Sequence, residues 1–186
     1  MMFDLQSCPI EGLKLIRRKV RFDERGCFER VYCSDELAAF TNGKTIRQIN
    51  RTITRRAGAI RGMHFQYPPH AEVKIVTCLR GRVWDVAVDL RIGSKTFLNN
   101  FATELFEGDE TSYVIPEGFA HGFQTLTDDC ELLYFHTADY KQESEGAVNA
   151  FDPKLAIPWP RSVTDISDRD RDHPMIQTGF LGLNLA

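Results

Sequence analysis

The sequence predicts an all-β fold, in which short strands form a barrel or sandwich and a few short helices lie at its periphery. Aromatic and β-branched residues, which favour strands, are spread over most of the chain. Residues that favour turns recur at short intervals between them, as at residues 80–81 and 127–129. Only one early segment, residues 34–40, favours a helix, for which Ser34 or Asp35 is the expected N-cap.

The expected strands are bounded by these turn signals, with further turns at residues 91–94 and 107–109. They cover residues 13–20, 46–54, 60–65, 74–80, 82–90, 96–105, 113–115, 122–126 and 130–137. After Tyr140 the composition changes, and we expect residues 150–186 to form a wrapping tail with a short helix near residues 166–171.

The length and composition favour one soluble domain over residues 1–186. Hydrophobic residues make up 42% of the chain and charged residues 26%, which is ordinary for a globular protein. A net charge of −3 argues against a general nucleic-acid-binding protein, which would carry a basic surplus.

No apolar run reaches the length of a membrane span, and the first residues lack the pattern of a secretory signal, so we expect a cytoplasmic protein with no membrane contact. The five cysteines are odd in number and form no Cys-x-x-Cys pair. We therefore expect small buried hydrophobic residues rather than disulfides or a thiolate metal site.

Several polar residues lie on strand faces that are otherwise apolar. Lys74 has the same parity as the apolar residues that follow it, and Tyr134 shares a face with His136. Strict alternation points Arg61 away from His64, but a bulge at Gly62 would turn both side chains inward.

Each of these residues also has a structural interpretation. A single histidine on a strand is commonly a hydrogen-bonded core residue, a tyrosine there is commonly core, and Lys74 at a strand end could extend its ammonium to water. Taken singly, the structural interpretation is favoured for Tyr134 and Lys74 and is as good as the functional one for His64. Together, they would give one barrel interior a base, an acid and two cations. We assign His136 and His173 structural roles and place His70 in an exposed loop.

Two motifs resemble the halves of a cupin barrel, GAIRGMHFQ at residues 58–66 and PEGFAH at residues 116–121. In most cupins a second histidine follows the first by two residues, and these imidazoles hold a metal. This chain has Gln66 at that position, and an amide is a poor replacement. We therefore expect no bound metal, which leaves His64 and His121 free for proton chemistry.

Over most of its length, the chain resembles the dTDP-4-dehydrorhamnose 3,5-epimerase family of nucleotide-sugar epimerases. The matching motifs include RGMHFQ at residues 61–66 and IPEGFAHGF at residues 115–123. Further matches lie at residues 23–26, 48–50, 74, 85–91, 145–146, 152–153, 157–160 and 166–170. The resemblance implies a cupin-type jelly roll, a homodimer that exchanges N-terminal strands, and no metal or other cofactor.

The resemblance also implies roles for individual residues. His64 would be the base and Asp170 the carboxylate behind it, while Tyr134 would return the proton from the opposite face. Lys74 would stabilise the oxygen at sugar carbon 4. The resemblance also implies substrate contacts, some of them supplied by a partner chain. They are Arg25, Arg30, Gln48, Asn50, Arg61, Lys74, His121, Tyr140, Glu145 and Arg169.

One departure from the family pattern concerns the nucleotide. Five residues beyond Arg25, some family members carry a glutamate, whereas this chain has Arg30, with Glu29 one position early. On a strand, one position reverses the face. A guanidinium would suit the acceptor at ring position 3 of cytosine rather than the N–H of thymine, or would add a phosphate contact.

The sequence leaves other functions open. It does not determine whether carbon 3, carbon 5 or both are epimerised. A ketoisomerase of the same fold would move the carbonyl between carbons 3 and 4 without the Tyr134 acid. A non-catalytic sugar-binding cupin would not need both His64 and Asp170, and a metal-dependent oxygenase would need a ligand in place of Gln66.

Overall fold

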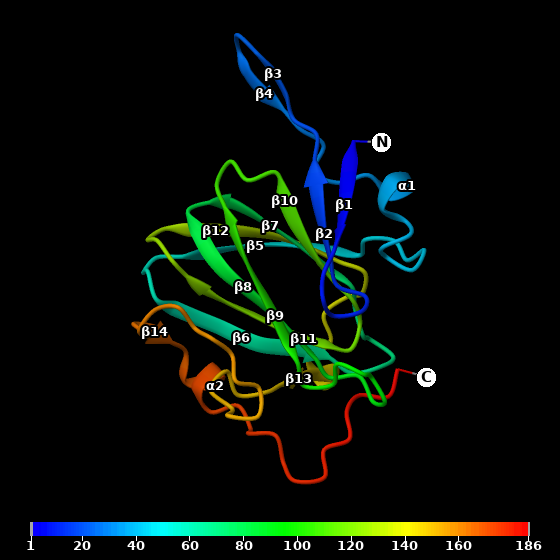
Figure 1. Cartoon of the computed structure of the whole chain (residues 1–186), viewed down its shortest axis with the longest axis vertical. Helices are drawn as coiled ribbons and strands as arrows, with labels where there is room; N and C mark the ends of the chain where they lie inside the picture. Colours follow the sequence, from blue (N-terminus) through cyan, green and yellow to red (C-terminus); the bar gives the residue numbers. More distant parts are fainter. Residues whose placement is uncertain (1, 186) are drawn as a thin grey trace.

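Two antiparallel β-sheets face each other and form a jelly-roll barrel (Figure 1). The computed structural model describes residues 2–185. In spatial order, the first sheet contains β1 (Phe3–Ser7), β2 (Lys14–Arg18), β10 (Thr111–Ile115), β7 (Lys74–Arg80), β12 (Cys130–His136) and β5 (Gln48–Thr54). The second contains β13 (Glu145–Ala147), β6 (Ala59–Gln66), β11 (Phe119–Thr125), β8 (Arg82–Asp89) and β9 (Asn100–Phe106), and β14 (Asp165–Ile166) pairs in parallel with β6. The all-β prediction is confirmed.

The remaining elements lie outside the barrel. The hairpin of β3 (Arg21–Asp23) and β4 (Gly26–Phe28) extends away from the two sheets (Figure 1). Helix α1 (Ser34–Leu37), the 3-10 helix η1 (Gln142–Ser144) and helix α2 (Asp168–Arg171) are each short. Among the described residues, no helix has the length and apolarity needed to cross a membrane.

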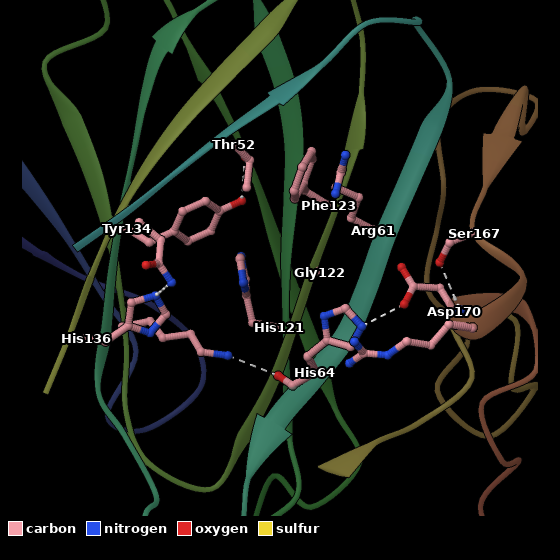
Figure 2. Close-up of a pocket in the computed structure, with 13 residues that line it drawn as sticks. Thr52, Arg61, His64, His121, Gly122, Phe123, Tyr134, His136, Ser167 and Asp170 are labelled. Carbon is pink, nitrogen blue, oxygen red and sulfur yellow. Dashed lines mark hydrogen bonds and ion pairs between the residues drawn. The ribbon is translucent and has the colours of Figure 1, made fainter. Parts of the chain in front are cut away.

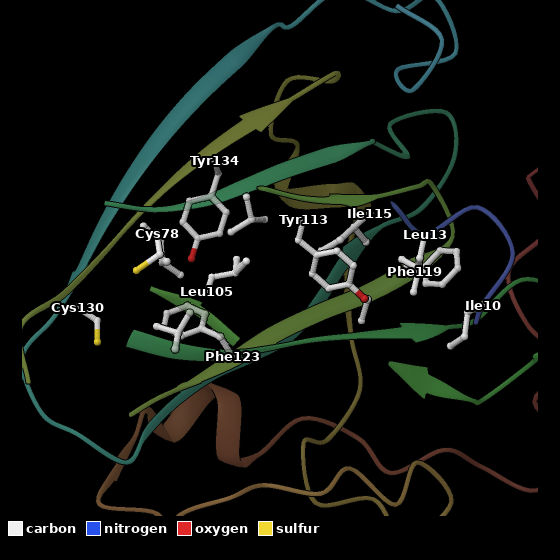
Figure 3. Packing of buried hydrophobic residues seen from close by; sticks show 14 residues of the cluster. Ile10, Leu13, Cys78, Leu105, Tyr113, Ile115, Phe119, Phe123, Cys130 and Tyr134 are labelled. Atoms are coloured by element: carbon white, nitrogen blue, oxygen red, sulfur yellow. The ribbon is translucent and has the colours of Figure 1, made fainter. Parts of the chain in front are cut away.

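The main core fills the space between the sheets (Figure 3). Val76 and Leu132 come from the first sheet, and Val83, Leu105 and Phe123 come from the second. All five have less than 4% of their surface exposed, so alternate strand positions supply the apolar face that holds the barrel together.

A second core lies on the outer face of the second sheet. Val86 and Val88 of β8 alternate with the residues of the main core and face outward. The segment after β13 covers them with Leu155, Ile176 and Leu183, all of them buried. This packing brings α2 beside β6, which places the residues of α2 next to the barrel opening.

The predicted strands are all present, and β7 has the predicted ends. The largest difference is in β9, which begins at Asn100 rather than at residue 96. The hydroxyl groups of Ser94 and Thr96 donate to Asp89 Oδ2 at 2.6 and 2.7 Å, which holds this stretch as a loop around a buried carboxylate. Side-chain hydrogen bonds of this kind compete with strand pairing.

Two further predictions are corrected by the structure. Helix α1 ends at Leu37, and its N-cap is Cys33 rather than Ser34 or Asp35. Cys78 and Cys130 are buried as expected, and burial raises the pKa of the Cys78 thiol to about 12. However, Cys27 is exposed, and Cys8 and Cys33 are only half-buried. All five thiols are free of disulfides.

Candidate active site

A cavity of about 300 Å³ opens at one end of the barrel, between the two sheets and α2 (Figure 2). Of the predicted site residues, the structure brings together Asn50, Arg61, His64, Lys74, His121, Tyr134, Arg169 and Asp170 around it. The cavity is also lined by residues that the sequence did not predict, namely Thr52, Gly122, Phe123, His136 and Ser167. The prediction therefore located the cavity, although several outer residues lie beyond it.

His64 and Asp170 form the first of three imidazole–carboxylate pairs in this cavity. His64 Nε2 lies 2.8 Å from Asp170 Oδ1, and the imidazole stands between the carboxylate and the cavity (Figure 2). The backbone N–H of Gly62 donates to Asp170 Oδ2 at 3.2 Å, and Ser167 Oγ caps α2 by accepting from the backbone N–H of Asp170. Burial acts to raise the pKa of Asp170, but His64 and the Gly62 N–H outweigh it and lower the pKa. An ionised Asp170 therefore accepts the Nε2 proton, which leaves His64 Nδ1 as a base.

A bulge in β6 allows Arg61 and His64 to share the cavity, as the sequence suggested. The pairing of β6 with β11 shifts register between His121 and Phe123. Gly62 has φ +131°, and a Cβ there would lie 2.5 Å from the Cα of Gly122. The strand needs glycine at this position, where two backbones touch and the face of the strand changes.

Lys74 remains inside the cavity because it has partners there. Its side chain is 10% exposed, and its Nζ donates to the backbone oxygen of His64 at 3.2 Å and pairs with Glu72 Oε1 at 3.3 Å. Burial acts to raise the pKa of Glu72, but Lys74 and His136 together lower it. This ion pair keeps the Lys74 ammonium in the wall of the cavity, and the side chain does not extend to water.

His121 forms the second pair, with Asp85 of β8. His121 Nε2 lies 2.8 Å from Asp85 Oδ1, and both side chains are almost fully buried. Asp85 Oδ2 has no hydrogen-bond partner among residues 2–185. The hydrogen bond to this buried carboxylate fixes the orientation of the His121 ring in the cavity wall.

Tyr134 lies on the wall formed by β12, facing the side of the cavity that holds His64. Its hydroxyl group is 3.4 Å from Thr52 Oγ1, and its ring packs near those of His121 and His136, with centroids 6.0 and 6.1 Å away. Burial raises the pKa of Tyr134 well above its ordinary value, so the phenol keeps its proton at neutral pH. The neutral phenol can therefore donate a proton, and the phenolate that remains is a strong base.

Two histidines to which the sequence assigned structural roles lie at the site. His136 lines the cavity and forms the third pair, with its Nδ1 3.0 Å from Glu72 Oε2. His173 approaches Asp170 Oδ1 to 3.2 Å. The shared face of Tyr134 and His136 was a usable signal for the first, and the three-residue spacing from Asp170 was a weaker signal for the second.

The rim of the cavity is a chain of hydrogen bonds that contains three further predicted residues. Gln48 donates to Asn50 Oδ1 at 3.1 Å and accepts from the backbone N–H of Tyr140 at 3.0 Å. The hydroxyl group of Tyr140 donates to Glu145 Oε2 at 3.0 Å, and Glu145 in turn pairs with Arg169. Both ends of this chain, Asn50 and Arg169, line the cavity.

Arg25 and Arg30 do not line the cavity of their own chain. Arg25 lies in the β3–β4 hairpin, where its side chain is 89% exposed and pairs with Asp23. Arg30 pairs with Glu36 at 2.9 Å. Within one chain, therefore, these two predicted contacts are not brought to the other site residues.

Gln66 does not line the cavity, which corrects the expectation that this residue decides whether the cavity holds a metal. Its side chain donates to the backbone oxygen of His70 and accepts from the backbone N–H of Lys141, so it secures two loops. The described residues whose donor atoms come close enough to hold a metal ion are His64, Asp170 and His173, all within 4.8 Å of one another. These atoms already share the hydrogen bonds described above.

Comparison with known proteins gives consistent matches. The family model for dTDP-4-dehydrorhamnose 3,5-epimerase matches residues 7–178. A dTDP-4-dehydrorhamnose 3,5-epimerase of Sinorhizobium fredii is 36% identical over 172 residues, which cover 92% of this chain and 88% of the relative. A dTDP-4-dehydrorhamnose 3-epimerase of Streptomyces niveus is 37% identical over 169 residues, which cover 90% of this chain and 81% of the relative.

Solved structures agree with this result. The crystal structure of dTDP-6-deoxy-D-glucose-3,5-epimerase from Legionella pneumophila, in complex with dTDP-4-keto-L-rhamnose, superposes with a TM-score of 0.90 at 32% identity. The match covers 99% of this chain and 100% of that one. The fold, the site and the relatives together show that this chain is an enzyme of the dTDP-4-dehydrorhamnose 3,5-epimerase family.

Proposed function

We propose that the protein epimerises a nucleoside-diphosphate 4-keto-6-deoxyhexose, with dTDP as the nucleotide, at sugar carbon 3, carbon 5 or both. The observation that carries the proposal is the placement of a base and an acid on facing walls of one cavity. His64, backed by Asp170, belongs to the second sheet, and Tyr134 belongs to the first. The relatives support the substrate class, because they act on dTDP-4-keto sugars.

The chemistry needs more than a base. A proton next to the ketone is about 12 pK units less acidic than an imidazolium, a gap of about 16 kcal/mol. The enolate must therefore be stabilised as it forms. Lys74 places an ammonium in the cavity wall, and His121 adds a ring fixed by Asp85. We assign these two side chains to the oxygen at carbon 4, where negative charge develops.

The proposed cycle has two proton transfers. His64 Nδ1 removes the proton from one face of the sugar, and the resulting imidazolium is stabilised by the Asp170 carboxylate. The electron pair moves onto the oxygen at carbon 4. Tyr134 then returns a proton to the other face of the same carbon, which inverts the stereocentre and restores the ketone. Tyr134 is left as a phenolate and His64 as an imidazolium, and exchange with water returns a proton to Tyr134 and removes one from His64 before the next turnover.

The nucleotide end of the substrate fits the cationic side of the cavity and its rim. Guanidinium groups suit diphosphate geometry, and Arg61 and Arg169 both line the cavity. Gln48, Asn50 and Glu145 offer hydrogen-bonding groups to the base and ribose, and Tyr140, half of whose surface is exposed, offers a ring on which the base stacks.

Replacing Tyr140 with alanine is expected to raise KM for the nucleotide sugar about tenfold with little change in kcat. Loss of base stacking costs about 1–3 kcal/mol in comparable sites, and Tyr140 lies at the rim rather than among the residues that line the cavity. Steady-state kinetics and calorimetry with dTDP measure the effect. Tyr140→Phe is the control, because it keeps the ring and removes only the bond to Glu145; a tenfold loss in that variant would assign the effect to the hydrogen bond instead.

Arg25 and Arg30 complete the proposal through a homodimer with exchanged N-terminal strands. The β3–β4 hairpin projects from the barrel (Figure 1), and its Phe22 and Phe28 side chains are exposed. Contact with a second chain would bury these apolar side chains and bring Arg25 of the hairpin to that chain. In such a dimer, Arg25 and Arg30 would reach the diphosphate in the partner's cavity.

A mixed dimer tests this exchange. Arg25→Ala and His64→Asn chains, coexpressed with different tags and purified as heterodimers, should regain about half of the wild-type activity. One cavity then has its own His64 and an intact Arg25 from its partner. No recovery over the two homodimers would mean that Arg25 serves its own chain, and a monomer in sedimentation would remove the proposal altogether.

The proposed activity is tested by incubating the protein with dTDP-4-keto-6-deoxyglucose in deuterated water and following the sugar by NMR. Deuterium at carbons 3 and 5 with inversion is the result for a 3,5-epimerase, and deuterium at one carbon is the result for a single-site epimerase. Movement of the carbonyl to carbon 3 would identify a ketoisomerase. Exchange only with a CDP-linked analogue would show that the substrate carries CDP rather than dTDP. Exchange with neither substrate would indicate a sugar-binding protein without this activity.

A further inference from the structure

One carboxylate in the cavity wall serves two imidazoles. His64 Nε2 lies 2.8 Å from Asp170 Oδ1, and His173 Nε2 lies 3.2 Å from the same oxygen. The two rings meet edge to face, with centroids 5.3 Å apart and planes at 89°. His173 itself does not line the cavity, and its side chain is 11% exposed.

We propose that His173 is a positioning residue for the reaction, which acts by sharing Asp170 Oδ1 with His64 and so limits the negative charge that Asp170 offers to the base. The proposal rests on the proposed function of His64. It differs from a purely structural role, because it links a residue outside the cavity to the protonation of the base.

The hydrogen bonds determine which way the protons point. An ionised carboxylate only accepts, so each imidazole donates its Nε2–H to Asp170 Oδ1. Burial and the neighbouring His64 lower the pKa of His173, so its ring is neutral at neutral pH. A second positive charge is thereby kept away from His64, which must become an imidazolium during the reaction.

Hydrogen bonds from Asn149 hold the backbone of His173 in place. The side-chain amide of Asn149, only 5% of whose surface is exposed, donates to the backbone oxygens of Arg171 and His173 at 3.0 Å each. The backbone N–H of Asn149 also donates to the backbone oxygen of Pro174 at 3.0 Å. A buried amide is thus used to hold the residues that follow α2 in a defined position over Asp170.

The other charged groups near this cluster come from three elements. Arg61 lies on β6 beside His64, and Lys74 of β7 donates to the backbone oxygen of His64. Arg169 of α2 lines the cavity, whereas Arg171 pairs with Asp168 and Ile166 and turns away. These cations are the same with and without His173, so a difference between the wild type and a His173 variant reports on the hydrogen bond to Asp170 Oδ1.

Replacing His173 with phenylalanine removes the donor and keeps a ring of similar size. Asp170 Oδ1 would then bind His64 alone, and the imidazolium would be favoured. The acidic limb of the pH profile of kcat is expected to move upward by about half to one pH unit. We expect kcat on the plateau to fall several-fold, because Asp170 has lost one of its anchors, while KM changes little.

Two matched variants separate this effect from general damage. His173→Gln restores an N–H donor near the position of Nε2 and should return the acidic limb toward that of the wild type. His70→Phe changes a half-buried loop histidine that has no role in the cluster and should leave the limb in place. An unshifted limb in His173→Phe, or a His173→Gln variant that behaves like His173→Phe, would overturn the proposal.

A second measurement does not depend on activity. NMR titration of the His64 ring in the free protein should give a higher midpoint in His173→Phe than in the wild type. An equal midpoint in the two proteins would overturn the inference even if the protein is an epimerase. A raised midpoint in a protein that shows no exchange would support the cluster and contradict the proposed function instead.

Discussion

Replacing His64 with asparagine is expected to lower the rate of epimerisation by about 10³-fold. General base catalysis contributes roughly 10²–10⁴-fold, and an amide cannot take a proton at neutral pH. Asparagine keeps a side chain that can donate to Asp170, so the buried carboxylate does not lose every partner; it also receives bonds from Gly62 and His173. The loss should therefore fall on the chemistry rather than on folding.

Deuterium exchange measures this loss directly, since it reports proton removal whether or not the stereocentre inverts. Exchange at both sugar carbons should fall together with epimerisation, while the affinity for dTDP in calorimetry changes little. His70→Asn is the control, because His70 lies in a loop outside the cavity. If the His64 variant still exchanged at a rate near that of the wild type, the base would have to be sought elsewhere in the cavity, with His121 the first choice.

The sequence predicted the inner part of the site because local patterns determine it. The two-residue period of a strand places Tyr134 and His136 on one face, and it places Lys74 on the face of Val76 and Cys78. Gly62 indicated the bulge that turns Arg61 inward. These features depend on a few neighbouring residues, so they could be seen without knowledge of the fold.

The partners of these residues could not be predicted in the same way. Glu72 meets His136 because β7 and β12 pair with Lys74 opposite His136, a register that only the folded sheet defines. His173 reaches Asp170 because the chain after α2 is held by Asn149, which precedes it by more than twenty residues. Contacts of this kind belong to tertiary packing, and the residue types alone did not distinguish them from structural histidines.

The missed strands have a similar explanation. Strands β3 and β4 have three residues each and are fully exposed, so they are too short to establish a two-residue period of apolar and polar positions. The short strands β13 and β14 both pair with β6. Strand β13 lies just before the segment expected to be a tail, and β14 lies within it, where Pro and charged residues gave no strand pattern. Their pairing places Glu145 at the rim and brings α2 beside His64, which makes the tail part of the site.

Replacing Tyr134 with phenylalanine should separate the two halves of the reaction. Proton removal by His64 needs only the base and the stabilised enolate, so we expect deuterium exchange to continue at a rate within about tenfold of the wild type. Return of a proton to the opposite face needs an acid on the first sheet, and inversion should fall by about 10²–10³-fold. The enolate would then be reprotonated by His64 on the face from which the proton left.

The structure offers a matched control for that substitution in Tyr113, a second buried tyrosine with a raised pKa. The hydroxyl group of Tyr113 donates to the backbone oxygen of Phe101 at 3.2 Å and does not line the cavity, so Tyr113→Phe removes a buried hydroxyl without touching the substrate. It should keep inversion and exchange coupled at some cost in stability, which thermal unfolding measures. Inversion at the wild-type rate in Tyr134→Phe would show that another group supplies the proton. Equal loss of exchange and inversion would mean instead that Tyr134 is needed before the enolate forms, because a residue that acts only as the returning acid leaves the first proton transfer intact.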